Sequence, residues 1–315
     1  MKTRDQTPIE PLGVRCRKVC VIEVPYDFGR TGWRMAQGPG AYVRAGLLQR
    51  IAGDGYQVRT QPVRLALSSS NEIQACFQAA RAVAQRVRQA VCDHEFPLIL
   101  AGNCMNAVGV LGGLEGSARG VVWFDAHCDF NDPETTETGF LDGMALSVAT
   151  GACWRELAAS IPQFRPVPAS SVLLLGARSI DAGERVALFA SHVTVLPWSE
   201  LQHGGRRATI GRAIEAFARH TRDVYLHVDM DVLDPRKARA NELAPPGGFA
   251  VADLADAVTL VCNHLSVHAA TFSGYSPGCD PERRTARAGL AVIQAVLAAT
   301  INRQPASAPS GRALR

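Results

Sequence analysis

Two short acidic motifs in this sequence carry side chains that commonly bind metal ions. The first motif contains Asp125, His127 and Asp129, and the second contains Asp229 and Asp231. Each motif follows an apolar run that reads as a strand, and alternate residues of a strand point to the same face. We therefore expect the side chains of each motif to converge. Four carboxylates and one imidazole exceed the needs of a single divalent cation, so the motifs predict a two-metal centre and favour a hydrolase.

Apolar runs alternate along the chain with segments of helical periodicity, and these elements must position the motifs. The runs are nearly continuous in Val, Leu and Ile, as expected for strands that are buried on both faces. Such alternation predicts an α/β fold of three layers, α/β/α, with a mainly parallel sheet. The expected strands are Val19–Val24, Leu98–Ala101, Gly120–Phe124, Val172–Gly176, Val193–Leu196, Val224–Val228 and Ala269–Phe272, and the expected helices are Glu72–Cys92, Thr209–His220, Val251–His264 and Ala286–Ala298.

Three of the predicted strands end in residues that can bind a ligand. One leads into Asn103 and Cys104, and the other two lead into Asp125 and Asp229. In open α/β sheets, ligands bind beyond the carboxyl ends of the strands. The site is therefore expected at this edge of the sheet.

The composition indicates one globular domain rather than a nucleic-acid-binding or membrane protein. The chain has 315 residues, 47% of them hydrophobic, and a net charge of +4 without a dense basic block. No apolar run approaches the ~20 residues that span a bilayer. The nine cysteines are scattered, which favours reduced thiols in a cytoplasmic enzyme. We expect one catalytic domain over residues 15–302, with flexible tails at 1–14 and 303–315.

The motif Asp-Ala-His-Xaa-Asp at 125–129 and the motif Asp-Xaa-Asp-Xaa-Xaa-Asp-Pro at 229–235 together resemble the ureohydrolases, the group of arginase, agmatinase and formimidoylglutamase. Gly38-Pro39 and the loop 176–181 resemble two further loops of that family, so the resemblance covers most of the chain. It implies an arginase-like fold and hydrolysis of a C–N bond in a small guanidino or amidino substrate, with release of urea or a substituted urea. A homo-oligomer is compatible with this resemblance.

The resemblance also implies two manganese ions and a role for each residue of the motifs. Asp125 and Asp229 would bridge both metals, Asp129 would bind the first, and His127 and Asp231 would bind the second. Oxygen-rich ligation with one imidazole suits manganese on chemical grounds. Asp129 would in addition take a proton from the attacking water and help to carry it to the leaving amine.

Cys104 departs from the family pattern, because the family has at this position a histidine that binds the first metal. As a ligand, a thiolate would open the site to zinc, iron or cobalt besides manganese. Alternatively, Cys104 is a small buried thiol and the first metal lacks one ligand. A cysteine here also resembles N-hydroxy-arginine amidinohydrolase, a biosynthetic relative that releases hydroxyurea.

A substrate loop is suggested by a further part of the resemblance. Asn131, Thr136 and Thr138 resemble residues that hold the amino-acid end of arginine, and Asp181 resembles a carboxylate that contacts the substrate's α-amino group. Without the resemblance these would be ordinary turn residues.

Two more positions depart from arginase. Asp142 stands where relatives often carry a histidine for proton transfer, and a carboxylic acid with a suitable pKa could serve there. The alternative for Asp142 is an exposed loop residue. Gly274 stands in place of a glutamate that binds the guanidinium group, which argues against arginine bound in the usual way.

Two other functions are alternatives to this assignment. A binuclear metallophosphoesterase would be expected to have more histidines in its motifs, whereas here only His127 lies in one. A catalytically impaired ureohydrolase-like protein is a further alternative, motivated by the departures at Cys104, Asp142 and Gly274. His227 shares a strand face with Asp229 and is expected to be no more than a neighbour of the ligands.

Overall fold

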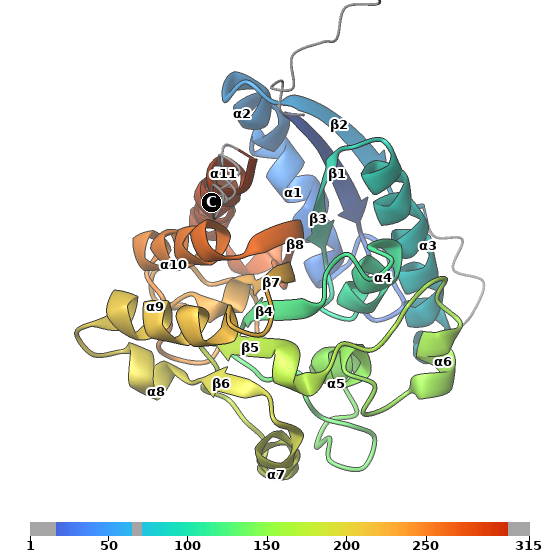
Figure 1. The fold of residues 1–315 in the computed structure, drawn as a ribbon. Coiled ribbons are helices and arrows are strands. Elements are labelled where there is room, and N and C mark those ends of the chain that lie inside the picture. Colours follow the sequence, from blue (N-terminus) through green and yellow to red (C-terminus); the bar gives the residue numbers. More distant parts are fainter. Residues whose placement is uncertain (1–16, 65–70, 302–315) are drawn as a thin grey trace, which may run out of the picture.

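The structure is a computed structural model that describes residues 17–64 and 71–301. The eight strands within these ranges form one parallel sheet in the order β2-β1-β3-β8-β7-β4-β5-β6 (Figure 1). The predicted α/β fold with a parallel sheet is thereby confirmed. The strands are β1 (Lys18–Val24), β2 (Gln57–Pro62), β3 (Phe96–Ala101), β4 (Gly120–Phe124), β5 (Val172–Leu175), β6 (Thr194–Leu196), β7 (Asp223–Asp229) and β8 (Ser266–Ser273).

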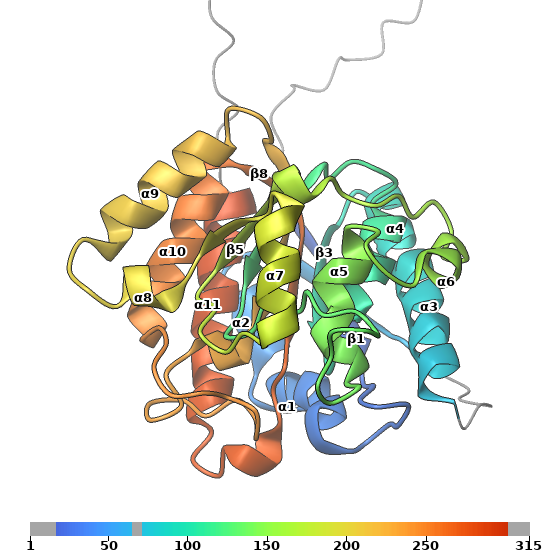
Figure 2. The same cartoon turned by 90° about the horizontal axis from the view of Figure 1, so that it is seen from below.

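Helices cover both faces of the sheet and create two apolar cores (Figures 1 and 2). The helices α1, α2 and α8 to α11 contribute to one core, and the helices α3 to α7 contribute to the other. The helices are α1 (Gly38–Arg44), α2 (Leu47–Gly53), α3 (Glu72–Cys92), α4 (Asn106–Gly113), α5 (Ala145–Ala149), α6 (Arg155–Ala159), α7 (Ala182–Ser191), α8 (Trp198–Leu201), α9 (Arg206–Phe217), α10 (Val251–His264) and α11 (Arg284–Ile301).

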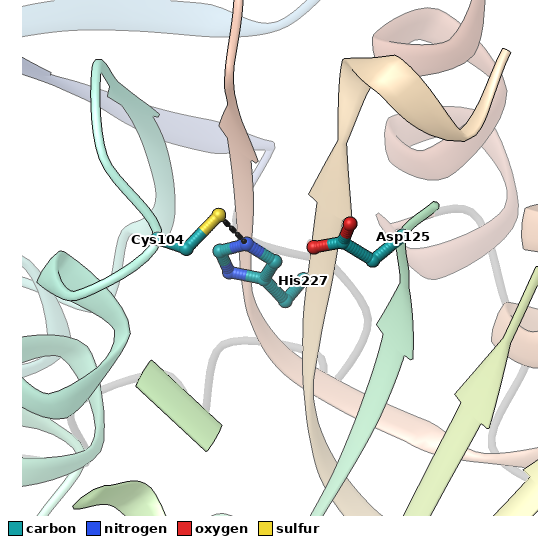
Figure 3. Close-up of side chains that lie close together, drawn as sticks. All are labelled: Cys104, Asp125 and His227. Atoms are coloured by element: carbon teal, nitrogen blue, oxygen red, sulfur yellow. Dashed lines mark hydrogen bonds between the residues drawn. The ribbon is translucent and has the colours of Figure 1, made fainter. Parts of the chain in front are cut away.

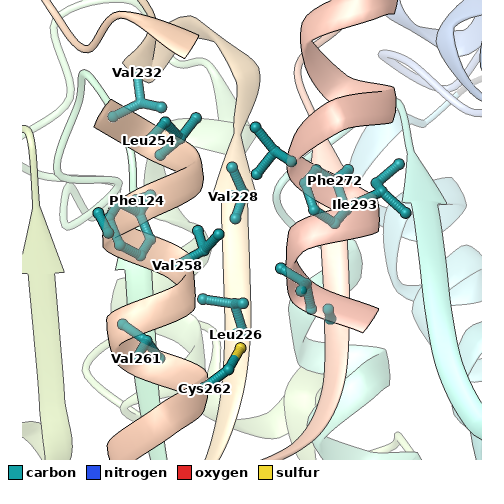
Figure 4. Packing of buried hydrophobic residues seen from close by; sticks show 14 of the residues in the cluster. Phe124, Leu226, Val228, Val232, Leu254, Val258, Val261, Cys262, Phe272 and Ile293 are labelled. Atoms are coloured by element: carbon teal, nitrogen blue, oxygen red, sulfur yellow. The ribbon is translucent and has the colours of Figure 1, made fainter. Parts of the chain in front are cut away.

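The first core shows why the central strands are almost purely apolar. Leu226 and Val228 of β7 belong to one cluster with Leu254 and Val258 of α10, and all four are fully buried (Figure 4). Burial of a Val or Leu side chain contributes about 1.5–3 kcal/mol each. This packing anchors β7, whose carboxyl end carries the second acidic motif.

Among the elements that were not expected from the sequence, strand β2 and helix α4 were missed for opposite reasons. Strand β2 is polar and has no buried residue, because it lies at the edge of the sheet and pairs only with β1. Helix α4 is buried on every side and therefore shows no amphipathic period. It packs so closely on α3 that a Cβ on Gly109 would lie 2.3 Å from the carbonyl oxygen of Ala80.

The central strands β3, β8, β7 and β4 are neighbours in the sheet, so their carboxyl ends form a row at one edge. This order brings together the loop that carries Cys104, the end of β8 at Ser273, the end of β7 at Asp229 and the loop that begins at Asp125. Segments far apart in the sequence thus meet at a single place.

The tails predicted at 1–14 and 303–315 lie outside the described residues, and the domain bounds 15–302 stay a prediction. The eight cysteines at described positions are free thiols. Among the helices of residues 17–64 and 71–301, none combines the length and apolar character required for a membrane span.

Candidate metal centre

The first acidic motif lies in a loop and not in a strand. The alternation of side chains along a strand, which was expected from the sequence, therefore does not explain why its side chains converge. Strand β4 ends at Phe124, and Asp129 has a left-handed backbone with φ of 51°. The His127 amide donates a 2.8 Å hydrogen bond to Asp125 Oδ1. Tight turning of the loop, rather than strand alternation, therefore brings these side chains together.

The second motif turns in a similar way at the end of β7. Asp229 is the last residue of the strand, and the Asp231 amide donates a 2.8 Å hydrogen bond to Asp229 Oδ1. The Ala126 amide donates to Asp231 Oδ1 at 3.2 Å, which joins the two loops. His127 Nδ1 lies 3.4 Å from Asp125 Oδ1 and 3.3 Å from Asp231 Oδ2. Asp125, His127 and Asp231 thus offer ligand atoms within 4.8 Å of one another.

The carboxylates of both motifs are buried together, and their pKa values reflect this crowding. Burial and the neighbouring Asp231 raise the pKa of Asp229, and burial and Asp125 raise that of Asp129. Burial would also raise the pKa of Asp231, but His127 outweighs that effect and lowers it. Buried charges of one sign are costly unless a counter-charge compensates for them.

The buried carboxylate of Asp129 is the most direct indication that this site binds a cation. Its side chain is buried, and Oδ2 has no hydrogen-bond partner within the described residues. Carboxylate oxygens with one imidazole are the donor set that manganese prefers. The residues of the site therefore fit a pair of divalent cations of this kind.

Cys104 lies in the loop after β3, is buried, and points toward His227 of β7 (Figure 3). Its Sγ donates to Asp229 Oδ2 at 3.0 Å and lies 3.2 Å from His227 Nε2. Burial and the charge of Asp229 raise the pKa of the thiol. This position is compatible with both roles considered for Cys104, so ligation of a metal by this residue stays a prediction.

A cavity of about 290 Å³ opens above the acidic motifs. It is lined by the substrate-loop residues expected from the sequence, Asn131, Thr136, Thr138 and Asp181, together with Asp142. Asn131 Nδ2 donates to Asp181 Oδ2 at 2.9 Å, and the two threonine hydroxyls accept from backbone amides of the same loop. The loop is thus held in place by its own hydrogen bonds.

The alternative of an exposed loop residue is wrong for Asp142, whose side chain is buried in the cavity wall. Its Oδ1 accepts from the Met105 amide at 2.7 Å, and its Oδ2 accepts from Asn103 Nδ2 at 2.8 Å. Burial raises the pKa of Asp142 to about 7, although the hydrogen bond from Met105 acts in the opposite direction. Asp142 therefore also fixes the loop that carries Cys104.

Two residues of the site were not singled out in the sequence. Glu184 lines the cavity and accepts a 2.8 Å hydrogen bond from the Phe130 amide, and burial raises its pKa to about 7. The spacing of Asp181 and Glu184 is that of a capping box, a signal that was available in the sequence. Asn241 Nδ2 donates to Asp231 Oδ2 at 3.3 Å, and no local pattern indicates this contact.

A parallel α/β sheet with buried carboxylates clustered at its carboxyl edge can hold divalent metals that activate water for hydrolysis. The model of the Arginase family matches residues 17–299, and this chain belongs to that family. It is accordingly a hydrolase of C–N bonds in linear amidines, and the family depends on a binuclear manganese centre.

Comparison with individual proteins agrees with this membership. The arginase of Bacillus subtilis is 27% identical over 293 residues, which cover 89% of this chain and 98% of the relative. The crystal structure of arginase from Bacillus cereus superposes with a TM-score of 0.82 at 26% identity and covers 89% of this chain and 98% of that one. Formimidoylglutamase from Bacillus subtilis, at 20% identity and a TM-score of 0.72, covers 95% of this chain and 93% of its own and shares the fold.

Proposed function

We propose that this chain is a two-metal amidinohydrolase that cleaves the guanidino C–N bond of an arginine-like substrate. The observation that carries the proposal is the gathering of four buried carboxylates and the half-buried His127 in the lining of a cavity of about 290 Å³. This volume lies at the small end of ligand cavities, which run from roughly 300 to 1,000 Å³, and suits a ligand of amino-acid size. The proposed metal ligands are Cys104, Asp125, His127, Asp129, Asp229 and Asp231.

A bound pair of divalent metals would lower the pKa of a water molecule and so supply the nucleophile near neutral pH. The oxygen of that water bonds to the guanidino carbon while the C–N bond to the leaving amine breaks. Both protons of the water must move to the amine nitrogen, because a guanidinium substrate and water yield urea, whose carbonyl oxygen carries no proton, and an ammonium group. We assign this transfer to Asp129, because its buried Oδ2 is free of hydrogen bonds to the described protein. Asp142, with a pKa raised to about 7 by burial, is the second candidate for proton transfer.

The substrate-loop residues in the lining of the cavity would hold the amino-acid end of the substrate. Asp181 supplies a carboxylate for an α-amino group, and Asn131, Thr136 and Thr138 supply neutral polar groups. These side chains are already ordered by the loop's own hydrogen bonds, so less conformational entropy is lost on binding.

N-hydroxy-arginine is a second candidate substrate, and Gly274 favours it. At this position arginases carry the glutamate that pairs with the guanidinium, and glycine offers no carboxylate. An N-hydroxylated guanidine is less basic and depends less on such a charge. Hydroxyurea would then be the product released.

A single panel of substrates tests the proposal. Manganese-loaded protein is assayed for release of urea and hydroxyurea from arginine, N-hydroxy-arginine, agmatine, guanidinobutyrate and formimidoylglutamate. We expect turnover of an α-amino-acid substrate, with agmatine and guanidinobutyrate far slower because they lack the α-amino or α-carboxylate group. Absence of turnover with every substrate would favour the catalytically impaired protein instead.

A further inference from the structure

Four polar side-chain atoms meet at the carboxyl ends of β3, β7 and β8, and one of them is the Asp229 Oδ2 of the second acidic motif. Cys104 Sγ lies 3.2 Å from His227 Nε2 and 3.2 Å from the Ser273 hydroxyl. The same hydroxyl lies 2.9 Å from His227 Nε2 and donates to Asp229 Oδ2 at 3.2 Å. Figure 3 shows the thiol and the imidazole pointing toward one another, with Asp125 on the far side of the ring.

The ring of His227 is held in one orientation by its surroundings. It stacks on Trp123 with ring centroids 3.6 Å apart and an interplanar angle of 10°. Its Nδ1 lies 2.9 Å from the Tyr225 hydroxyl, which leaves Nε2 as the nitrogen that faces Cys104. An outer partner that fixes the ring and engages the other nitrogen is a usual feature of a metal-binding histidine.

The distances among these groups suit a shared cation. Cys104, Asp125 and His227 offer one ligand atom each, all within 4.8 Å of one another. Bonds of about 2.0–2.3 Å from a single metal to sulfur, nitrogen and oxygen require separations of this order. If His227 Nε2 binds a metal and no longer contacts the Ser273 hydroxyl, that hydroxyl can still donate a hydrogen bond to Asp229.

The second group of donors differs in its chemistry. It consists of Asp125, His127 and Asp231, two carboxylates and one imidazole, and it shares Asp125 with the first group. Thiolate and imidazole donors favour zinc or cobalt, whereas carboxylates favour manganese or magnesium. The two halves of the centre thus present unequal donor sets.

We propose that His227 Nε2 and Cys104 Sγ both bind the first metal. The subsite of this metal therefore prefers zinc or cobalt over manganese. The imidazole that the first metal has in relatives would thereby come from β7 instead of the loop after β3. The inference rests on the proposed two-metal function and assigns unequal metal preferences to its two halves.

Replacement of one metal tests the inference without any assay of activity. Full-length protein loaded with manganese is equilibrated with one equivalent of Co²⁺. Released Mn²⁺ is measured by electron paramagnetic resonance, and the thiolate-to-cobalt charge-transfer band is measured by absorption. We expect one of two manganese ions to be released, together with a thiolate band.

Variants assign the ligands. Cys104→Ser should abolish the band, and His227→Gln should weaken cobalt binding at this subsite at least about tenfold. Cys262→Ser is the matched control, because Cys262 is as buried as Cys104 but lies on α10 in the other apolar core and should leave the band intact. Ser273→Ala removes a contact of the same cluster without removing a ligand and should preserve the band.

The outcomes separate the inference from the proposed function. If two manganese ions stay bound in the presence of cobalt and no thiolate-to-cobalt band appears, the inference is overturned and the proposed function still stands. An unchanged cobalt affinity in His227→Gln would overturn the role of His227. Protein that binds neither manganese nor cobalt would overturn both.

Discussion

Gly274 faces the carboxylate of Asp229 so closely that a Cβ on the glycine would lie 2.2 Å from both carboxylate oxygens. The glycine also has a φ of +71°, a conformation that side chains with a Cβ rarely adopt. In this structure the position of Asp229 therefore leaves no room for a Cβ at residue 274, where the sequence departs from the arginase pattern. A glutamate cannot simply be restored there.

Gly274→Ala should disturb the metal centre more than the fold. Strain from the positive φ and overpacking against Asp229 together should cost about 3 kcal/mol. The displaced carboxylate should weaken manganese binding at least tenfold.

Gly116→Ala is the control, because Gly116 has a φ of +83° with nothing within 4 Å of a Cβ. It should cost about 1 kcal/mol and leave metal content unchanged. Urea denaturation and metal analysis give both quantities, and equal metal content in the two variants would contradict the account of Gly274.

Asp229→Asn should remove metal and activity together, because Asp229 is proposed to contact both metals. Bound manganese should fall below one ion per chain and turnover at least a hundredfold. Asp234→Asn is the matched control, since Asp234 is also buried but accepts hydrogen bonds from Arg236 rather than facing the cavity. Full metal content in Asp229→Asn would count against the two-metal centre.

The stability of metal-free protein should depend on pH through Glu184. Burial raises the pKa of Glu184 from 4.5 to about 7 in the folded state. A raised carboxyl pKa means that the folded state holds the proton more tightly, so its stabilising effect is complete below pH 4.5 and is lost as the pH rises through 7. The loss should amount to roughly 3 kcal/mol.

Glu184→Gln isolates this contribution, because glutamine does not titrate. The difference in unfolding free energy between wild type and variant should change by that amount between pH 4.5 and pH 8 in urea denaturation. A difference independent of pH would show that Glu184 does not titrate in this range.

Arg178 forms hydrogen bonds that hold the backbone of the second motif and of the segment after it in place. Its guanidinium donates to the carbonyl oxygens of Asp231 at 2.8 Å, Leu233 at 3.2 Å and Pro246 at 3.1 Å. Lysine keeps the charge but cannot reproduce this fork, so Arg178→Lys should destabilise the protein by about 2–3 kcal/mol in urea denaturation. Arg236→Lys, which alters an arginine whose side chain is 80% exposed, should have no measurable effect. Equal stability of the two variants would refute the structural role of Arg178.

Much of the fold was predictable because its signals are local. Helices Glu72–Cys92 and Val251–His264 were predicted with the bounds that the structure has, since each has one apolar face and one polar face. The polar edge strand β2 and the fully buried helix α4 lack such periodicity. Their conformation is decided by neighbours far away in the sequence.

The site was predictable in its residue types but not in its geometry. Asp125 and Asp229 were recognisable from their spacing to other acidic residues, yet the left-handed turn at Asp129 has no signal in a sequence without glycine there. The contact of Cys104 with His227 joins residues 123 positions apart. The close approach of Gly274 to Asp229 depends likewise on the order of strands β8 and β7.

The most direct test of the central claim combines metal analysis with single-turnover product detection on N-hydroxy-arginine and arginine. If the chain is a two-metal amidinohydrolase, protein reconstituted with manganese will hold two metal ions per chain and will release hydroxyurea or urea in proportion to the metal bound. Two bound metals without either product, or product formation that persists after complete removal of metal, would contradict it.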